Sequence, residues 1–223
     1  MNPRVATIRA FLFDMDGVLV DSNPLHRRAW EAFNRFHGIE TTPEMHQRMY
    51  GKRNDEIVRD FFGEALSDAE VFEHGRAKET LYRELASKQI EDMLVPGVRE
   101  FLRKYHYVPK AVATNAEPNN VSFFLDGLRL GASFDAVVDG DQVKRPKPYP
   151  DIYLRAAELV GEPPEACLVF EDSHSGVAAG VAAGMKVIGL TTTHVNLPGT
   201  CLSIDNFLSA ELHSWLRGQV RSV

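Results

Sequence analysis

Apolar residues along this chain follow two different patterns, short continuous runs and longer stretches with helical spacing. The run from Ile8 to Phe13 has the length of a buried strand. From about Asp21 to Glu91 the spacing is helical, and no strand is indicated. From Pro96 onward strand and helix patterns alternate, which predicts a doubly wound, mostly parallel α/β sheet. The further strands are predicted at 110–114, 134–138, 167–170 and 186–190, and the helices between them at 98–105, 121–128, 152–160 and 175–183.

The helical stretch separates the first strand from the rest of the sheet. Helix starts are indicated within it by Pro24, by Thr42-Pro43 and by the capping box formed by Ser67 and Glu70. We therefore expect a core domain made of residues 1–20 and 92–223, with an all-helical domain of residues 21–91 inserted after the first strand.

Composition and charge restrict the class of protein. The chain has 223 residues, of which 44% are hydrophobic and 25% charged, as in ordinary globular proteins. The net charge is −6 and there is no basic block, which argues against nucleic acid or an anionic membrane as partner. No apolar run approaches the roughly 18 residues of a membrane span, and the first residues do not resemble a signal peptide. Cys167 opens an apolar run and is expected to be a buried free thiol, so we expect a cytoplasmic protein.

Polar residues follow the predicted strands at the edge where an open α/β sheet binds its ligands. Asp14 and Asp16 follow the first strand, and Gly17 then allows a sharp turn. Thr114-Asn115 and Glu171-Asp172 follow two later strands. Carboxylates gathered in this way repel one another unless a cation neutralises them, and Mg²⁺ prefers such oxygen ligands. The pattern predicts a Mg²⁺ site beside a carboxylate that can act as a nucleophile.

Two features of this edge remain open at the level of sequence. Thr114, Asn115 and Ser173 are also good helix N-cap residues, so some of them can be structural. The positive charge that the edge requires can come from Lys147 or from Lys144. We favour Lys147, because prolines on both sides restrict the loop that presents it.

Four motifs in order along the chain resemble those of the haloacid dehalogenase (HAD) superfamily of phosphotransferases. The first is the segment from Asp14 to Ser22, with its two acids and Gly17; Thr114 corresponds to the second. The third is Lys147 in Lys-Pro-x-Pro-Asp, and the fourth is Glu171-Asp172-Ser173 followed by a glycine. The helical insertion is similar to the small cap of the subgroup that holds β-phosphoglucomutases and phosphoglycolate-type phosphatases.

The resemblance implies a mechanism and a role for each motif residue. Asp14 attacks phosphorus to form an aspartyl-phosphate, and Asp16 moves the protons. Mg²⁺ is held by Asp14, by the backbone carbonyl of Asp16 and by Asp172, with Glu171 close by. Phosphoryl oxygens are bound by Thr114 and the amide of Asn115, while Lys147 offsets negative charge.

Three other activities fit the motifs less well. Dehalogenases of the superfamily lack the second acid of the first motif, which is present here as Asp16. Phosphonate-cleaving members have a changed first motif, whereas this one is ordinary. A binding or scaffold protein would carry an intact metal pocket without using it.

The choice between a hydrolase and a mutase depends on the helical insertion. His26 is placed like a histidine that couples cap closure to proton transfer in β-phosphoglucomutases, and Lys78 is placed like a cap lysine that contacts sugar phosphate. A histidine at this place also occurs in cap-bearing sugar phosphatases, and a histidine on a helix face is as often a surface or capping group. A lysine such as Lys78 is more often a solvated helix residue. Where the mutase presents an arginine to the second phosphate, this chain has Asn54, with Arg53 adjacent.

We therefore expect a Mg²⁺-dependent phosphatase, with β-phosphoglucomutase as the alternative. The basic residues Lys52, Arg53, Arg76 and Lys78 suggest a small anionic metabolite, such as a sugar phosphate, as the substrate. The chain is expected to act as a monomer.

Overall fold

The apolar strands form one parallel six-stranded sheet in the computed structural model, which describes residues 7–50 and 52–220. The order is β3-β2-β1-β4-β5-β6, so the first strand lies between the two strands whose ends carry the other polar motifs. The strands are β1 (Ala10–Phe13), β2 (Lys110–Ala113), β3 (Ala136–Val138), β4 (Cys167–Glu171), β5 (Lys186–Leu190) and β6 (Leu202–Ile204). The predicted fold class is confirmed.

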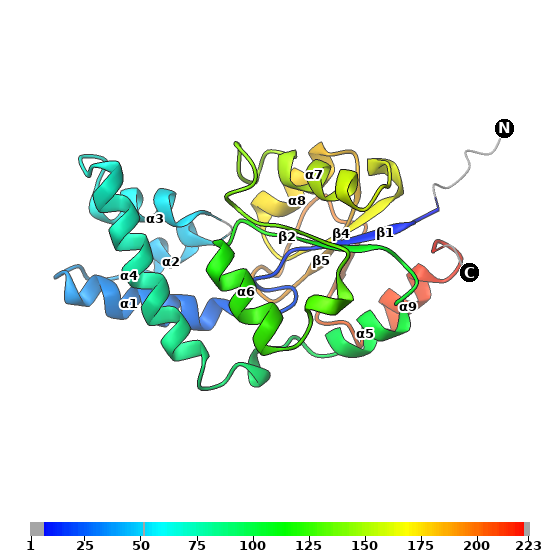
Figure 1. Ribbon diagram of the computed structural model, residues 1–223, viewed down its shortest axis with the longest axis horizontal. Coiled ribbons are helices and arrows are strands. Elements are labelled where there is room, and N and C mark those ends of the chain that lie inside the picture. Colours follow the sequence, from blue (N-terminus) through cyan, green and yellow to red (C-terminus); the bar gives the residue numbers. More distant parts are fainter. Residues whose placement is uncertain (1–6, 51, 221–223) are drawn as a thin grey trace.

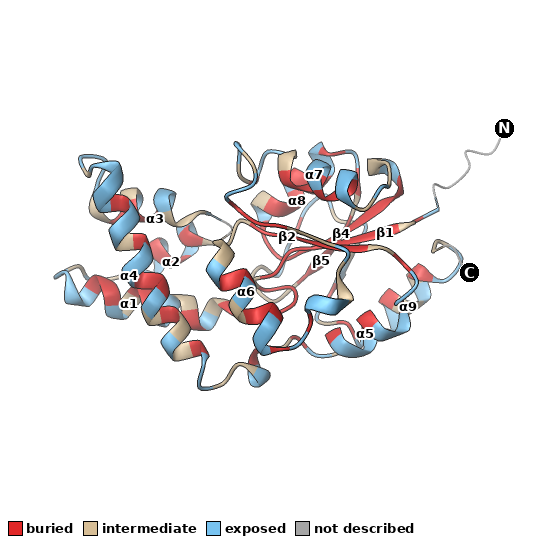
Figure 2. Cartoon of the chain, in the orientation of Figure 1, coloured by how far each residue is buried: buried red, intermediate tan, exposed pale blue. Residues whose placement is uncertain are grey.

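Successive residues of a strand pack against opposite layers of helices, because the side chains of a strand point alternately to the two faces of the sheet. Leu12 belongs to a core with α7 (Asp151–Leu159) and α8 (His174–Ala182). Phe11 and Phe13 belong to a larger core with α5 (Val98–Lys104), α6 (Pro118–Gly127) and α9 (Ala210–Leu216). Figure 1 shows these two helical layers on either side of the sheet, and Figure 2 shows that the strands between them are buried.

Four helices follow β1 and lie together beyond one end of the sheet (Figure 1). They are α1 (Asn23–Phe36), α2 (Pro43–Met49), α3 (Asn54–Phe62) and α4 (Asp68–Ala86). Trp30, Phe33, Val58 and Phe61 are part of an apolar core that these helices share among themselves. Ser67 begins α4 as the capping box predicts, because its backbone N–H donates to Glu70 at 2.9 Å.

Several boundaries differ from those expected. β1 begins at Ala10 instead of Ile8, which makes only an isolated bridge to Val220. β3 begins at Ala136 instead of Phe134, and the preceding Asp135 is joined to Lys110 of β2 by one backbone bond and one side-chain bond, each of 2.8 Å. Three short 3₁₀ turns connect elements of the core, at Glu91–Met93, Gly131–Ser133 and Pro164–Ala166.

The last strand and the last helix were not predicted. β6 has three residues and only its last one, Ile204, is buried, so it carries almost no apolar pattern. Helix α9 does have a start signal, because the Ser209 side chain accepts a hydrogen bond from Leu212 N at 3.2 Å. Its buried residues Leu212 and Leu216 have helical spacing, and this signal was available in the sequence.

The cysteines and the helices agree with the expectations drawn from composition. Cys167 is buried and Cys201 is exposed, and both thiols are free. Within the described ranges, every helix is too short or too polar to cross a bilayer.

Candidate active site

Strand register brings the three polar motifs to one edge of the sheet. Phe13, the last residue of β1, pairs with Val112 of β2 on one side and with Phe170 of β4 on the other. The same edge of the sheet therefore carries Asp14 after β1, Thr114 after β2 and Glu171 as the last residue of β4. Asp14, Thr114 and Glu171 are all buried there.

A tight turn after β1 places a second acid beside the first. Gly17 has a φ of +76°, a conformation that favours glycine. A Cβ atom at this position would lie 1.9 Å from Asp172 Oδ2. Glycine is thus required here both for the turn and for the close approach of the Asp172 carboxylate.

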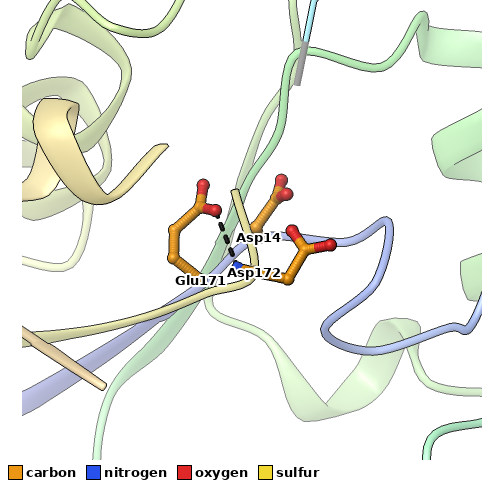
Figure 3. A group of neighbouring side chains, drawn as sticks. All are labelled: Asp14, Glu171 and Asp172. Atoms are coloured by element: carbon orange, nitrogen blue, oxygen red, sulfur yellow. Dashed lines mark hydrogen bonds between the residues drawn. The ribbon is translucent and has the colours of Figure 1, made fainter. Parts of the chain in front are cut away.

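Three buried carboxylates and one lysine form the centre of the site. One oxygen from each of Asp14, Glu171 and Asp172 lies within 4.8 Å of the others. Figure 3 shows the three side chains side by side at the ends of β1 and β4. Lys147 Nζ lies 2.9 Å from Asp14 Oδ1 and 2.7 Å from Glu171 Oε1. The cluster therefore has one positive charge for three carboxyl groups.

Glu171 is fully engaged in hydrogen bonds with the protein. Its Oε1 accepts from Lys147 and from the Tyr153 hydroxyl at 2.8 Å, and its Oε2 accepts from the backbone of Asp172 and from Ser173. Burial would raise the pKa of this carboxyl, but the Lys147 charge and these hydrogen bonds hold the pKa below its usual value. The ionised Glu171 carboxylate therefore holds Lys147 in position.

The charges of the Asp14 and Asp172 carboxylates are not offset by their neighbours to the same extent. Burial raises the pKa of Asp14 to about 7, although Lys147 partly offsets this effect. Burial and the nearby Glu171 charge raise the pKa of Asp172 well above its usual value. Two desolvated carboxyl groups with too little positive charge around them, both offering oxygen donors, fit a hard divalent cation such as Mg²⁺.

The phosphate-binding candidates lie next to this cluster. Thr114 is buried, and its hydroxyl oxygen accepts a hydrogen bond from Ala116 N at 3.1 Å, which leaves the hydroxyl proton available for donation. Asn115 Oδ1 accepts from the backbone of Lys147 at 3.3 Å and so ties the two motifs together. Lys147 is the buried lysine of its loop, whereas Lys144 is exposed, which decides between the two.

Thr114, Asn115 and Ser173 were also candidates for helix N-caps, and one of the three is an N-cap. Ser173 is the N-cap of α8, because its hydroxyl accepts from Gly176 N at 3.0 Å. The N-cap of α6 is Glu117, so Thr114 and Asn115 do not cap that helix.

Asp16 is linked to the helical insertion. Its Oδ1 accepts a hydrogen bond from Ser22 Oγ at 2.5 Å and lies 3.5 Å from His26 Nε2. The His26 ring stacks on Tyr82 with 3.7 Å between ring centroids, and Lys78 Nζ lies 3.0 Å from His26 Nδ1. Lys78 is only 1% exposed, so it is not a solvated surface lysine.

A cleft separates the sheet edge from the helical insertion. From the core it is lined by the site residues Asp14, Asp16, Thr114, Asn115, Lys147 and Asp172. From the insertion it is lined by His26, Trp30, Met49, Tyr50, Lys52, Asn54, Ile57, Lys78 and Glu79. Arg53 and Arg76 line a second hollow beside α3 and α4, which adjoins the cleft at Asn54, Asn115 and Glu117.

Two side chains that hold Asp172 were not anticipated. Thr193 donates its hydroxyl proton to Asp172 Oδ2, and Asn23 Nδ2 donates to the same oxygen at 3.3 Å. Thr193 lies in Thr191-Thr192-Thr193, directly after β5. The rule that polar residues at strand ends form the site would have identified it if it had been applied to this strand as well.

Magnesium is expected to stabilise the fold. An ion held by Asp14 and Asp172 would bind a site that the unfolded chain lacks, so Mg²⁺ at about 100 times its Kd should contribute roughly 2.7 kcal/mol. For a chain of this size the melting temperature should rise by about 5–10 °C. The rise should disappear in Asp172→Asn and persist in Glu100→Gln, an exposed acid on α5. A scanning fluorimetry series with EDTA as reference measures this, and equal shifts in both variants would contradict the assignment.

Comparison with known proteins identifies the family of this chain. A model of the haloacid dehalogenase-like hydrolase family matches residues 8–184. A phosphorylated carbohydrates phosphatase of Thermotoga maritima is 36% identical over 188 residues, which cover 81% of this chain and 84% of the relative. A β-phosphoglucomutase of Mycobacterium bovis is 31% identical over 210 residues, covering 81% and 80%. The solved structure of a HAD hydrolase, family IA, variant 3 from Entamoeba histolytica matches with a TM-score of 0.83 and 28% identity, over 94% of this chain and 99% of that one. This chain is therefore an enzyme of the haloacid dehalogenase-like hydrolase family.

Proposed function

We propose that this enzyme is a Mg²⁺-dependent phosphatase that hydrolyses a small phosphorylated metabolite of the sugar phosphate class through an aspartyl-phosphate on Asp14. The observation that carries the proposal is the position of the Asp14 carboxylate. It lies at the cleft, 2.9 Å from Lys147 Nζ, with Asp16 two residues further along the same turn. The phosphatase and phosphoglucomutase names among the relatives support this substrate class.

In the first step Asp14 attacks the phosphorus atom of the substrate. A bond forms between the carboxylate oxygen and phosphorus, and the bond from phosphorus to the substrate oxygen breaks. Asp16, in its acid form, donates a proton to the departing oxygen. Lys147 and Thr114 provide the charge and the hydrogen bond that stabilise the phosphoryl oxygens.

In the second step water attacks the phosphorus of the aspartyl-phosphate, and Asp16 takes up the water proton. The Asp14 carboxylate is released together with inorganic phosphate, so the enzyme returns to its starting state. Asp14, Asp172 and the backbone carbonyl of Asp16 would hold Mg²⁺. The ion would supply positive charge that offsets the charge of the phosphoryl group.

The helical insertion of residues 21–91 would act as a cap over a core of residues 1–20 and 92–223. Its side chains form one wall of the cleft, and His26 connects it to Asp16. A cap of this kind excludes water from the reacting groups until the attack on the intermediate. All of these groups come from one chain, which supports a monomeric enzyme.

A β-phosphoglucomutase is the second candidate, because His26 and Lys78 are placed like two cap residues of that enzyme, although a histidine at this place also occurs in sugar phosphatases. In that reaction a sugar hydroxyl would attack the aspartyl-phosphate in place of water. The mutase must also bind a sugar bisphosphate, which requires free cations at the end of the cleft away from Asp14. Lys78 is already bound to Glu79 at 2.5 Å, Arg53 lies 3.8 Å from Asp141, and Lys52, which lines the cleft, is exposed to solvent. These contacts favour the phosphatase.

Product analysis should separate the two activities. With Mg²⁺ we expect free phosphate to be released from at least one member of a panel of sugar monophosphates. β-Glucose 1-phosphate, offered with a trace of glucose 1,6-bisphosphate, should not be converted to glucose 6-phosphate. Formation of glucose 6-phosphate without free phosphate, followed by coupled dehydrogenase assay, would establish the mutase instead.

A further inference from the structure

A buried carboxylate lies in the wall of the cleft that faces the catalytic edge. Glu79 on α4 is 2% exposed and lines the cleft with Asn54 and Asn120. Its Oε1 accepts from Asn54 Nδ2 at 2.8 Å, and its Oε2 accepts from Asn120 Nδ2 at 2.7 Å. Burial would raise the pKa of Glu79, but the charge of Lys78 and the bond from Asn120 hold it at about 2. Glu79 is therefore negatively charged at neutral pH.

The ammonium group of Lys78 is paired with the Glu79 carboxylate. Its Nζ donates to Glu79 Oε1 at 2.5 Å and lies 3.0 Å from His26 Nδ1. The ammonium also lies 4.8 Å from the centre of the Trp30 ring. The buried pair of Lys78 and Glu79 is neutral as a unit, so this wall offers no net positive charge from it.

Other cations near this wall are similarly occupied or distant. Arg83 pairs with Glu117, which itself lines the cleft. Arg53 faces the second hollow and lies 3.8 Å from Asp141. Lys52 lines the cleft but is exposed, and water and salt screen its charge.

We propose that Glu79 is a specificity-determining residue that selects monophosphates with a neutral, hydroxyl-bearing remainder and rejects substrates with a second phosphate. The inference rests on the proposed function, because it assumes that the first phosphate lies against Asp14. The inference goes beyond the proposed function because it names the class of substrate and the residue that selects this class.

Charge explains the rejection of a second phosphate. A phosphate monoester carries a charge of about −1.5 to −2 at neutral pH. Because Glu79 cancels the charge of Lys78, this wall offers a second phosphate no net positive charge to offset the cost of taking that phosphate out of water. The pairing is fixed, because Asn54 and Asn120 hold the Glu79 carboxylate from two other sides.

Hydrogen bonding explains the acceptance of hydroxyl groups. An ionised carboxylate can accept about four hydrogen bonds, and three protein donors reach Glu79. A sugar hydroxyl can use the remaining capacity without adding charge. The neighbouring amide groups of Asn54 and Asn120 are neutral, which suits the same kind of ligand.

Equilibrium binding tests this inference separately from turnover. Asp14→Asn serves as the background in every sample, with Mg²⁺ present, so that the ligands are not consumed. Isothermal titration would compare glucose 6-phosphate with glucose 1,6-bisphosphate, and fructose 1-phosphate with fructose 1,6-bisphosphate. Within each pair the ligands differ by one phosphate group. We expect at least one monophosphate to bind 10-fold or more tightly than its bisphosphate.

The decisive variant is Glu79→Gln, which keeps the shape and frees the Lys78 charge. It should reduce the preference for the monophosphate at least 10-fold. Glu84→Gln makes the same charge change at an exposed position of the same helix and should leave the preference unchanged. If Glu79 were merely structural, its replacement would weaken both ligands equally and leave the ratio as it was.

The outcomes are distinguishable from those for the proposed function. A bisphosphate that binds as tightly as its monophosphate would overturn the role of Glu79, as would an unchanged ratio in Glu79→Gln or binding of none of the four ligands. Phosphate release by the unmodified enzyme reports on the phosphatase activity alone. Should Glu79→Gln fail to fold, Glu79→Asp, which keeps the charge but shortens the side chain, should fold and retain the preference; its loss in that variant would also contradict the inference.

Discussion

Replacing Asp14 by asparagine is expected to lower kcat for phosphate release by at least about 10³-fold, because the amide cannot form the acyl-phosphate that the reaction requires. The variant should still fold. Asparagine has nearly the same shape, and the change removes one of three buried carboxyl groups that share a single lysine. The relief of this repulsion should keep the melting temperature in the absence of Mg²⁺ equal to or above that of the unmodified chain.

A matched control is available at another strand end of the same sheet. Asp139 follows β3 and is nearly buried, and it accepts hydrogen bonds from Asp141 N and Gln142. Because Asp139 does not line the cleft, Asp139→Asn should leave kcat within a few-fold of normal. Near-normal phosphate release by Asp14→Asn, measured alongside this control, would refute the nucleophile assignment.

Replacing Lys147 by methionine should reduce both activity and stability. The substitution leaves Asp14 and Glu171 buried without their common partner. Breaking a buried ion pair from one side typically costs about 3–5 kcal/mol, which corresponds here to a fall in melting temperature of roughly 10 °C. The loss of a positive charge at the phosphoryl group should lower kcat/KM by at least about 10²-fold.

A double variant separates the two effects. Adding Glu171→Gln to Lys147→Met removes the charge that has lost its partner, so part of the melting temperature should return. The activity should not return, because the lysine at the phosphoryl group is still missing. Calorimetry and a phosphate-release assay test this directly, and recovery of both properties together would contradict a role of Lys147 at the phosphoryl group.

The components of the site were visible in the sequence because each is a local feature. An apolar run that ends in acids, a threonine after a strand, and a lysine between prolines are all readable within a few residues. The parallel sheet follows from alternation of strand and helix, and parallel strands direct their ends to one edge. These two facts are sufficient to predict from the sequence that Asp14, Thr114 and Glu171 lie close together.

Partnerships between distant segments were decided only by the tertiary structure. Nothing near Lys78 in sequence indicates that it is 1% exposed and contacts His26, which lies 52 residues away. Asn54 and Asn120 meet at Glu79 from α3 and α6, and neither carries a motif.

The sequence by itself determined the sheet, the edge that carries the chemistry and the acids that belong to it, since periodicity and strand-end position are properties of short segments. The prolines around Lys147 favoured it over Lys144, but only the tertiary structure showed that Lys147 is buried at the site and paired with Asp14 and Glu171. The physical reason is that burial and charge pairing depend on which surfaces meet after folding.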